Sequence, residues 1–219
     1  MTSREWLEAM SDQELVAYGD ALIADTRVLV TRTAPPIKVK RGSIELIVGP
    51  MFSGKSTELL RRVRRLKAAK KTWLPLVYGK DNRFSDASED LGATHDGDTF
   101  EARKVLTLEE VPQTDIDGVE WVVLDEAQFF PHLAEHIERW AAQGKNVIIA
   151  ALNGTWQREP FPEVSALYAL QTKLDSLNAI CSYCGESAPY SKRLTQCTEL
   201  EEIGGADKYA ATCADCFFL

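Results

Sequence analysis

The chain has 219 residues and is acidic, with 33 Asp and Glu residues against 25 Lys and Arg residues and a net charge of −8 at pH 7. Its 45% hydrophobic and 26% charged positions are typical of a globular protein and exclude a disordered or collagen-like chain. The acidity argues against a protein whose main partner is the phosphate backbone of nucleic acid.

Nothing in the sequence predicts a membrane segment. The longest uncharged apolar stretches, 121–124 and 147–152, are far shorter than the roughly 18 residues that a membrane span needs. Charged residues, Arg4, Glu5 and Glu8, stand where a secretory signal would place its apolar run. We therefore expect a cytoplasmic protein with no membrane partner and no nucleic-acid partner.

Residues 1–42 are predicted to form a helical N-terminal extension and a linker. Ser11 and Glu14 have the spacing of a capping box, and apolar residues recur after them at helical intervals: Leu15, Tyr18 and Leu22. The prolines of the segment 33–36 then end the helical pattern, because proline lacks a backbone donor and restricts its predecessor.

From Ser43 onward, strand and helix patterns alternate, which predicts an α/β fold with a mainly parallel sheet over residues 43–175. The predicted strands are 44–48, 73–78, 121–124 and 146–152. The predicted helices are 58–70, with its basic residues on a solvated face, and one with Pro131 in its first turn that ends at Gly144. The segment 81–99 lacks periodicity and is rich in Asp, Ser and Gly, which predicts a long loop.

The segment 49–56 matches the phosphate-binding loop G-x-x-x-x-G-K-S and lies between a predicted strand and a predicted helix. Its backbone N–H groups are expected to bind phosphate oxygens, with Lys55 on the β and γ phosphates and the Ser56 hydroxyl on Mg²⁺. The predicted nucleotide-binding residues of the loop are Gly49, Pro50, Met51, Phe52, Ser53, Gly54, Lys55 and Ser56.

Asp125 and Glu126 end the apolar strand 121–124. Two such acids are often only capping or loop residues, but a phosphate-binding loop upstream favours a metal site. Asp125 is predicted to bind Mg²⁺, directly or through water, and Glu126 is the candidate general base.

His132 and His136 fit the metallopeptidase pattern H-x-x-E-H. We reject a metal site there because no third ligand is evident and the segment directly follows the carboxylate strand. Both histidines are expected at a solvated helix edge.

Residues 176–219 contain two Cys-x-x-Cys pairs separated by 28 residues. This spacing predicts a tetrahedral, structural Zn²⁺ site formed by Cys181, Cys184, Cys213 and Cys216. Two disulfides are disfavoured in a reducing compartment, and an iron–sulfur cluster remains an alternative. Cys197 is expected to be a free thiol, and the long loop between the pairs is expected to cover a ligand.

The motifs 49–59, 125–130 and 203–209 together with the four cysteines resemble the cytosolic, zinc-containing thymidine kinases. The resemblance implies an α/β P-loop kinase domain over residues 43–175 and a small zinc-bound lasso domain over residues 176–219. It also implies phosphorylation of thymidine by ATP and Mg²⁺ at the 5′-hydroxyl, in deoxynucleotide salvage, by a homotetramer that thymidine triphosphate inhibits.

Carried over by position, the resemblance places Glu126 as the base, Gln128 beside the nucleotide, Asp81 on the 3′-hydroxyl and Arg83 on the phosphate side. The remaining residues implied to contact the nucleoside are Met51, Phe129, Leu152, Trp156, Phe161, Ser191, Leu200, Ile203, Gly204 and Tyr209. Ser191 stands where threonine is frequent and Trp156 where phenylalanine is frequent, which predicts an altered fit around the 5-position of the base.

Two other functions fit parts of the pattern. A nucleic-acid-directed ATPase can combine a P-loop domain with a zinc ribbon, but it needs a basic track that this acidic chain lacks. A regulatory nucleotide-binding protein without turnover is disfavoured because both Asp125 and Glu126 are present.

Overall fold

The computed structural model describes residues 40–79, 91–93, 99–197 and 204–219, together with residues 11, 13, 14 and 17. The chain divides into two compact units, Met1–Val39 and Lys40–Leu219. In the first unit, the backbone N–H of Ser11 (2.9 Å) and its hydroxyl (2.7 Å) donate to the Glu14 carboxylate. Gln13, Glu14 and Ala17 are helical. The predicted pairing of Ser11 with Glu14 at a helix start is therefore confirmed.

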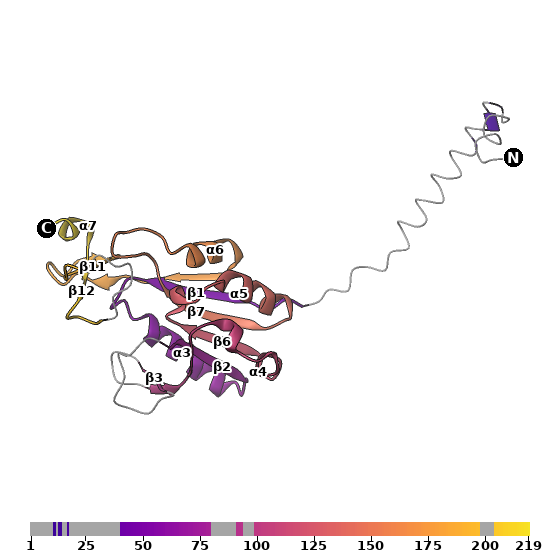
Figure 1. The fold of residues 1–219 in the computed structure, drawn as a ribbon, viewed down its shortest axis with the longest axis horizontal. Helices are drawn as coiled ribbons and strands as arrows, with labels where there is room; N and C mark the ends of the chain where they lie inside the picture. The colour runs from indigo at the N-terminus through magenta and orange to yellow at the C-terminus, as the bar shows by residue number, and fades with distance from the viewer. Residues whose placement is uncertain are drawn as a thin grey trace. The chain divides into compact units, whose positions relative to one another are not determined.

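The second unit is built on a six-stranded sheet in the order β5-β2-β6-β7-β1-β8 (Figure 1). Every neighbouring pair in this sheet is parallel, so the predicted α/β class with a mainly parallel sheet is confirmed. The strands are β1 (Ile44–Gly49), β2 (Trp73–Tyr78), β5 (Arg103–Val105), β6 (Trp121–Asp125), β7 (Asn146–Leu152) and β8 (Lys173–Ser176).

Helices cover both faces of the sheet because strand side chains alternate between its faces. On one face, Leu46 and Val122 pack in a core with α4 (Gln113–Asp117), α5 (Leu133–Ala142) and α6 (Pro162–Leu170). On the other face, a second core joins residues of β1, β6 and β7 to the apolar side of α3 (Lys55–Ala68). Two 3₁₀ turns complete this part: η1 (Leu108–Glu110) and η2 (Ala127–Phe129).

The loops that follow β1, β2, β6 and β7 leave the sheet at its carboxyl edge, since parallel strands end at the same edge. In open α/β sheets ligands bind in the crevice outside this edge. The predicted phosphate-binding loop follows β1, and the predicted acids stand at the end of β6. The fold therefore brings the two motifs to one edge of the sheet.

The cysteine-rich part consists of short elements. They are β9 (Ala179–Ile180) paired with β10 (Ser187–Ala188), β11 (Tyr190–Arg193) paired with β12 (Tyr209–Thr212), and α7 (Ala214–Phe217). Their small core contains Ala179, Ala188 and Ala211 together with Cys181 and Cys216. No helix in the described parts of the chain has the length and apolar character that crossing a membrane requires.

Four local predictions differ from the structure. Within the predicted loop 81–99, β3 (Leu91–Ala93) pairs antiparallel with β4 (Thr99–Glu101). Pro131 precedes the N-cap of α5 instead of entering its first turn, because His132 takes a left-handed conformation there. The other two concern Arg62 and His136.

Arg62 was expected on a solvated helix face, but it is 5% exposed. Its guanidinium contacts Glu58 on the same helix, Glu45 on β1 and Asp175 on β8. A buried cation needs paired partners, and these three acids come from separate segments of the chain. The contacts hold α3 against β1 and β8.

His136 was expected to be solvated, but it is buried. Its Nδ1 accepts from the Arg139 guanidinium (2.8 Å), and its Nε2 lies 3.0 Å from the Glu109 carboxylate. Because arginine can only donate, Nε2 carries the proton and donates to Glu109. His132 is exposed as expected, and the described residues contain no metal-ligand cluster at these histidines.

Candidate active site

The phosphate-binding loop connects β1 to α3 and has two glycines that its geometry requires. A Cβ on Gly49 would lie 2.6 Å from both Leu177 O and Ser53 Oγ, too close for any other residue. Gly54 is the N-cap of α3 with φ 81°, a left-handed conformation that favours glycine. The loop therefore delivers the N-terminus of a 14-residue helix to the carboxyl edge of the sheet, where its partial positive charge favours anions.

Lys55 is buried at the start of α3. Its ammonium donates to the carbonyl oxygen of Pro50 (2.8 Å), and the Ser53 hydroxyl donates to the same oxygen (2.9 Å). These contacts hold the Lys55 ammonium within the loop and fix the loop's curvature. A cation in this position has the charge that binding of phosphate requires, and the phosphate contact of Lys55 stays a prediction.

Asp125 ends β6 and is buried beside the loop. Burial and, secondly, the charge of Glu126 raise its pKa from 3.8 to about 6. The Ser56 hydroxyl, the backbone N–H of Glu126 and the charge of Lys55 act in the opposite direction. Ser56 and Asp125 thus meet, although 69 positions of sequence separate them, and a hydroxyl beside a buried carboxylate fits the oxygen ligands that Mg²⁺ prefers.

Glu126 adopts a left-handed backbone conformation, with φ 52° and ψ 39°. Its carboxylate accepts from the Gln128 amide Nε2 (2.7 Å), while Gln128 Oε1 accepts from the backbone N–H of Leu152 (3.0 Å). Since Leu152 N–H can only donate, the Gln128 amide must present its NH₂ group to Glu126. Gln128 therefore fixes the Glu126 carboxylate relative to the end of β7.

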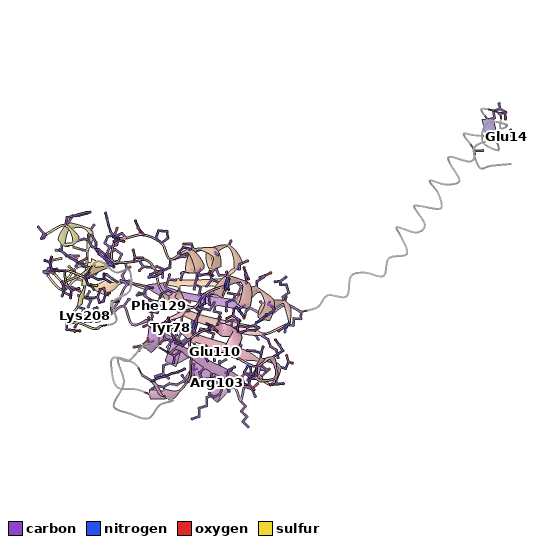
Figure 2. All side chains as sticks on the ribbon, viewed as in Figure 1. Glu14, Tyr78, Arg103, Glu110, Phe129 and Lys208 are labelled. Carbon is purple, nitrogen blue, oxygen red and sulfur yellow. The ribbon has the colours of Figure 1, made fainter. Side chains whose placement is uncertain are left out.

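Aromatic side chains lie next to these acids. Phe129 follows Gln128 in η2, and its ring centroid lies 5.2 Å from that of Tyr78 at the end of β2 (Figure 2). Phe161 makes an edge-on contact with Phe129 at 6.4 Å. Two residues predicted to contact the nucleoside, Phe129 and Phe161, are thus brought together, and Tyr78 joins them without having been predicted.

The β11–β12 hairpin reaches the phosphate-binding loop. Ser191 on β11 is buried, and its Oγ accepts from the backbone N–H of Met51 (2.9 Å). Asn153, directly after β7, donates to Pro189 O just before the hairpin (3.0 Å). The predicted residues Met51 and Ser191, 140 positions apart, therefore meet.

Trp156 and Tyr209, also predicted to contact the nucleoside, lie against one guanidinium group. The Cζ atom of Arg193 lies 4.6 Å from the Trp156 ring centroid and 5.3 Å from that of Tyr209. Arg193 was not predicted as a site residue. The alternation of β11, in which Ser191 and Arg193 share a face, is the signal that could have identified it.

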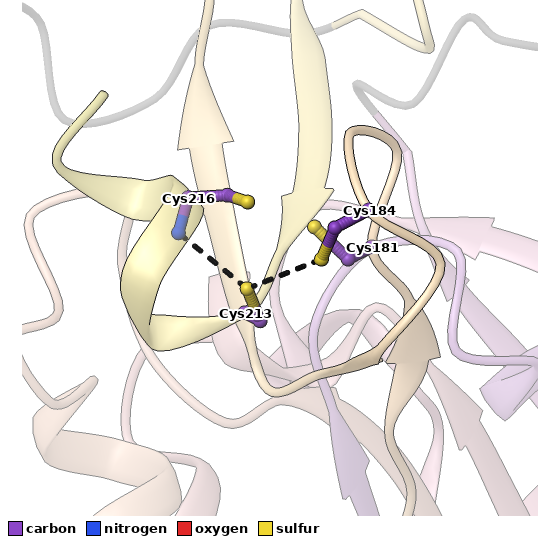
Figure 3. A group of neighbouring side chains, drawn as sticks. All are labelled: Cys181, Cys184, Cys213 and Cys216. Carbon is purple, nitrogen blue, oxygen red and sulfur yellow. Dashed lines mark hydrogen bonds between the residues drawn. The ribbon is translucent and has the colours of Figure 1, made fainter.

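The four predicted zinc ligands converge from the β9–β10 turn and the start of α7 (Figure 3). The Sγ atoms of Cys181, Cys184, Cys213 and Cys216 all lie within 4.8 Å of one another, with Cys184 and Cys213 3.6 Å apart. A tetrahedral Zn²⁺ with Zn–S bonds of about 2.3 Å requires sulfur separations of about 3.8 Å, so the cluster fits that ion. Cys197 is outside the cluster. This arrangement is consistent with the predicted lasso domain.

Four predicted site residues lie outside the residues that the structure describes: Asp81, Arg83, Leu200 and Ile203. Gly204 begins the described segment 204–219 and is half-buried.

Comparisons with known proteins agree with this geometry. Residues 42–217 match the sequence model of the thymidine kinase family. The chain is 47% identical over 178 residues to the cytosolic thymidine kinase of Homo sapiens, covering 81% of this chain and 74% of the human protein. It is 46% identical over 178 residues to the Gallus gallus cytosolic enzyme, covering 81% and 78% of the two chains. It is 44% identical over 177 residues to the thymidine kinase of Myxoma virus (strain Lausanne), covering 81% and 97%. The resemblance inferred from the motifs is thereby confirmed: the chain belongs to the thymidine kinase family.

Proposed function

We propose that this protein transfers the γ-phosphoryl group of ATP to the 5′-hydroxyl of thymidine, giving thymidine monophosphate and ADP, in pyrimidine deoxynucleotide salvage. The observation that carries the proposal is the convergence of the phosphate-binding loop, the Asp125–Glu126 pair and the β11–β12 hairpin at one edge of the sheet. Family membership supplies the reaction class.

The residues at the sheet edge have different roles in the phosphoryl transfer. The N–H groups of the loop and Lys55 bind the phosphates, and Ser56 and Asp125 hold Mg²⁺. When bound, Mg²⁺ neutralises charge on the phosphate oxygens. Glu126 accepts the proton of the 5′-hydroxyl while the oxygen of that hydroxyl forms a bond to the γ-phosphorus. The bond between that phosphorus and the bridging oxygen of ADP breaks.

The nucleoside is bound beside these groups. Met51, Phe129, Leu152, Phe161 and Tyr209 form the apolar walls, with Trp156 and Ser191 near the base. Asp81 holds the 3′-hydroxyl, Arg83 acts on the phosphate side, and the lasso contributes Leu200, Ile203 and Gly204. The contact between Phe129 and Phe161 and the hydrogen bond between Ser191 and Met51 support this assignment.

Zn²⁺ has a structural role in this proposal. Four thiolates complete its tetrahedral shell and leave no position for substrate. Burial opposes ionisation of the Cys181 thiol, but backbone N–H groups of Cys213, Tyr183 and Cys184 lower its pKa to about 6, which favours the thiolate that zinc requires.

The proposal includes a cytoplasmic homotetramer inhibited by thymidine triphosphate. Thymidine triphosphate, the end product of the pathway, resembles both substrates, because it carries the nucleoside of thymidine and the triphosphate of ATP. It can therefore occupy both halves of the site at once.

The test is incubation of the protein with γ-labelled ATP, Mg²⁺ and a panel of nucleosides. Labelled thymidine monophosphate is expected, with no product from purine nucleosides. Release of labelled phosphate that requires single-stranded DNA or RNA would instead indicate a nucleic-acid-directed ATPase. Nucleotide binding without any turnover would indicate a regulatory protein.

A further inference from the structure

Arg193 is a buried cation, 8% exposed, on the second strand position after Ser191. One Nη atom donates to the Tyr209 hydroxyl (2.7 Å), and the other donates to the carbonyl oxygen of Cys197 (3.1 Å). Tyr209 lies directly opposite Arg193 in the antiparallel β11–β12 pair. The guanidinium therefore connects the two strands of the hairpin and the segment by which the chain leaves β11.

The same guanidinium reaches the P-loop domain through Trp156. Its Cζ lies 4.6 Å from the Trp156 ring centroid, within the range of a cation–π contact. Trp156 is itself held by its loop, because the Thr155 hydroxyl accepts from the backbone N–H groups of Gln157 and Glu159. The position of the Tyr209 ring is thus fixed relative to a rigid turn that follows β7.

From these contacts we infer that Arg193 is a positioning residue for the nucleoside: it sets the separation and orientation of Trp156 and Tyr209. This inference rests on the proposed function, which places both rings at the nucleoside. Arginine suits the role because one planar group can stack on a ring while donating in two directions. Lysine can neither stack in this way nor span the two acceptors.

Replacement of Arg193 should therefore weaken nucleoside binding selectively. In Arg193→Met, we expect KM for thymidine to rise about tenfold, the loss expected for a charged hydrogen bond together with a ring contact, and KM for ATP to change less than about twofold. Arg193→Lys should likewise raise KM for thymidine and leave KM for ATP within about twofold of the wild type. In a Tyr209→Phe background, Arg193→Met should raise KM for thymidine by a smaller factor than it does in the wild type, because the hydrogen bond between the two residues is already absent.

Lys192→Met is the matched control. Lys192 is the neighbouring cation on the opposite side of β11, where its ammonium donates to Cys216 O (3.3 Å). Its removal should leave KM for thymidine within about twofold of the wild type. Elemental analysis of each variant should show the zinc content of the wild type, which excludes loss of the folded hairpin as the cause.

A spectroscopic measurement tests the packing without turnover. The emission of Trp156, isolated as the difference between spectra with and without Trp156→Phe, should shift in Arg193→Met and stay unchanged in Lys192→Met. Equal changes in both KM values, a wild-type KM for thymidine in Arg193→Lys, or an unshifted Trp156 emission would overturn the inference. Absence of thymidine phosphorylation by the wild type would overturn the proposed function instead.

Discussion

Glu126 combines a strained backbone with a fixed side chain. A left-handed conformation at a residue other than glycine costs about 1 kcal/mol or more, and it persists here because Gln128 and the end of β7 hold the carboxylate. This geometry lets two consecutive acids differ in environment, since Asp125 is buried beside Ser56 and Glu126 accepts an amide hydrogen bond. The separate roles proposed for the two acids follow from that difference.

Glu126→Gln is expected to leave ATP binding nearly unchanged and to lower kcat by about 10²-fold or more, because a positioned base contributes about 10²–10⁴ in rate. The substitution preserves the side-chain length and an oxygen that accepts from Gln128. Steady-state kinetics and ATP titration measure the two effects. An unchanged kcat would remove Glu126 from the role of base.

Asp125→Asn is expected to stabilise the protein without added Mg²⁺ or nucleotide while abolishing Mg²⁺-dependent turnover. The pKa of Asp125 is about 6 in the folded chain against 3.8 without burial, so the folded state retains a proton that the unfolded chain loses. Stability therefore falls as pH rises from about 4 to about 6, and the penalty at pH 7 is about 3 kcal/mol.

Thermal melts of the wild type and of Asp125→Asn at pH 5 and pH 7.5 test whether Asp125 lowers stability as the pH rises. The variant's gain in Tm should be larger at pH 7.5. Asp117→Asn, at an exposed position on α4, is the control and should show no such difference. A gain of equal size at both pH values would contradict the prediction.

Ser191 should determine how the protein discriminates at the 5-position of the base. Its hydroxyl is already used by Met51 N–H, so Ser191→Thr adds only a methyl group, worth about 1–3 kcal/mol of discrimination. We expect the wild type to phosphorylate deoxyuridine and 5-ethyl deoxyuridine with a kcat/KM within roughly 10- to 100-fold of that for thymidine. Ser191→Thr should lower the kcat/KM of both analogues relative to thymidine. Comparison of kcat/KM across the three substrates is the measurement, and an unchanged ranking would exclude Ser191 from selectivity.

At the scale of elements, the long strands and helices were predictable because each carries its own pattern. The predicted strands 73–78 and 146–152 coincide with β2 and β7, and β1 and β6 differ from prediction by one residue. Helix α3 begins at Lys55, three residues before the predicted start, because Gly54 caps it. The hydrophobic alternation that defines these elements is a local property of the sequence.

The short elements were not predictable in the same way. Strands β3 and β4 have three residues each, too few to show a period, and they exist because they pair with each other. Arg62 and His136 are buried by partners up to 113 positions away, which no local window contains. The phosphate loop and the cysteines could be located from sequence because each is a local motif. The contacts of Ser191 and Arg193 could not, because their partners are distant in the sequence.

The cysteine-rich part, β9 to β12 and α7, should be needed for the nucleoside more than for ATP. One tightly bound zinc per chain is expected by elemental analysis, and Cys184→Ser should lower zinc content and raise KM for thymidine more than KM for ATP. This part of the chain carries Ser191 and Tyr209, which the proposal assigns to the nucleoside, and it contacts the phosphate-binding loop through the hydrogen bond from Met51 to Ser191 and the packing of Phe52. The effect on ATP should therefore be smaller than the effect on thymidine.

Cys197→Ser is the control, since Cys197 lies outside the cysteine cluster, and it should retain the metal. Iron in place of zinc, or full activity in metal-free protein, would contradict the structural role.

At the scale of the whole molecule, the N-terminal extension should be dispensable for catalysis. Residues Lys40–Leu219 form a compact unit that contains the described active-site residues, whereas Met1–Val39 forms a separate one. A chain beginning at Lys38 should therefore fold and keep the kcat of the full-length protein, with any change confined to its assembly or stability. Activity assays and the mass in solution test this, and a folded, tetrameric but inactive chain would refute it.

The strand order also bears on how the family diverges. Strand β7 separates β1, which leads into the phosphate loop, from β6, which ends in Asp125. Two inter-strand steps, together about 10 Å, set the main-chain separation of these groups, and backbone hydrogen bonds maintain it whichever side chains fill the core. Core residues can therefore be exchanged over generations without displacing the reacting groups. The 47% identity with the human relative leaves room for such exchange, because fewer than half of the aligned residues are shared.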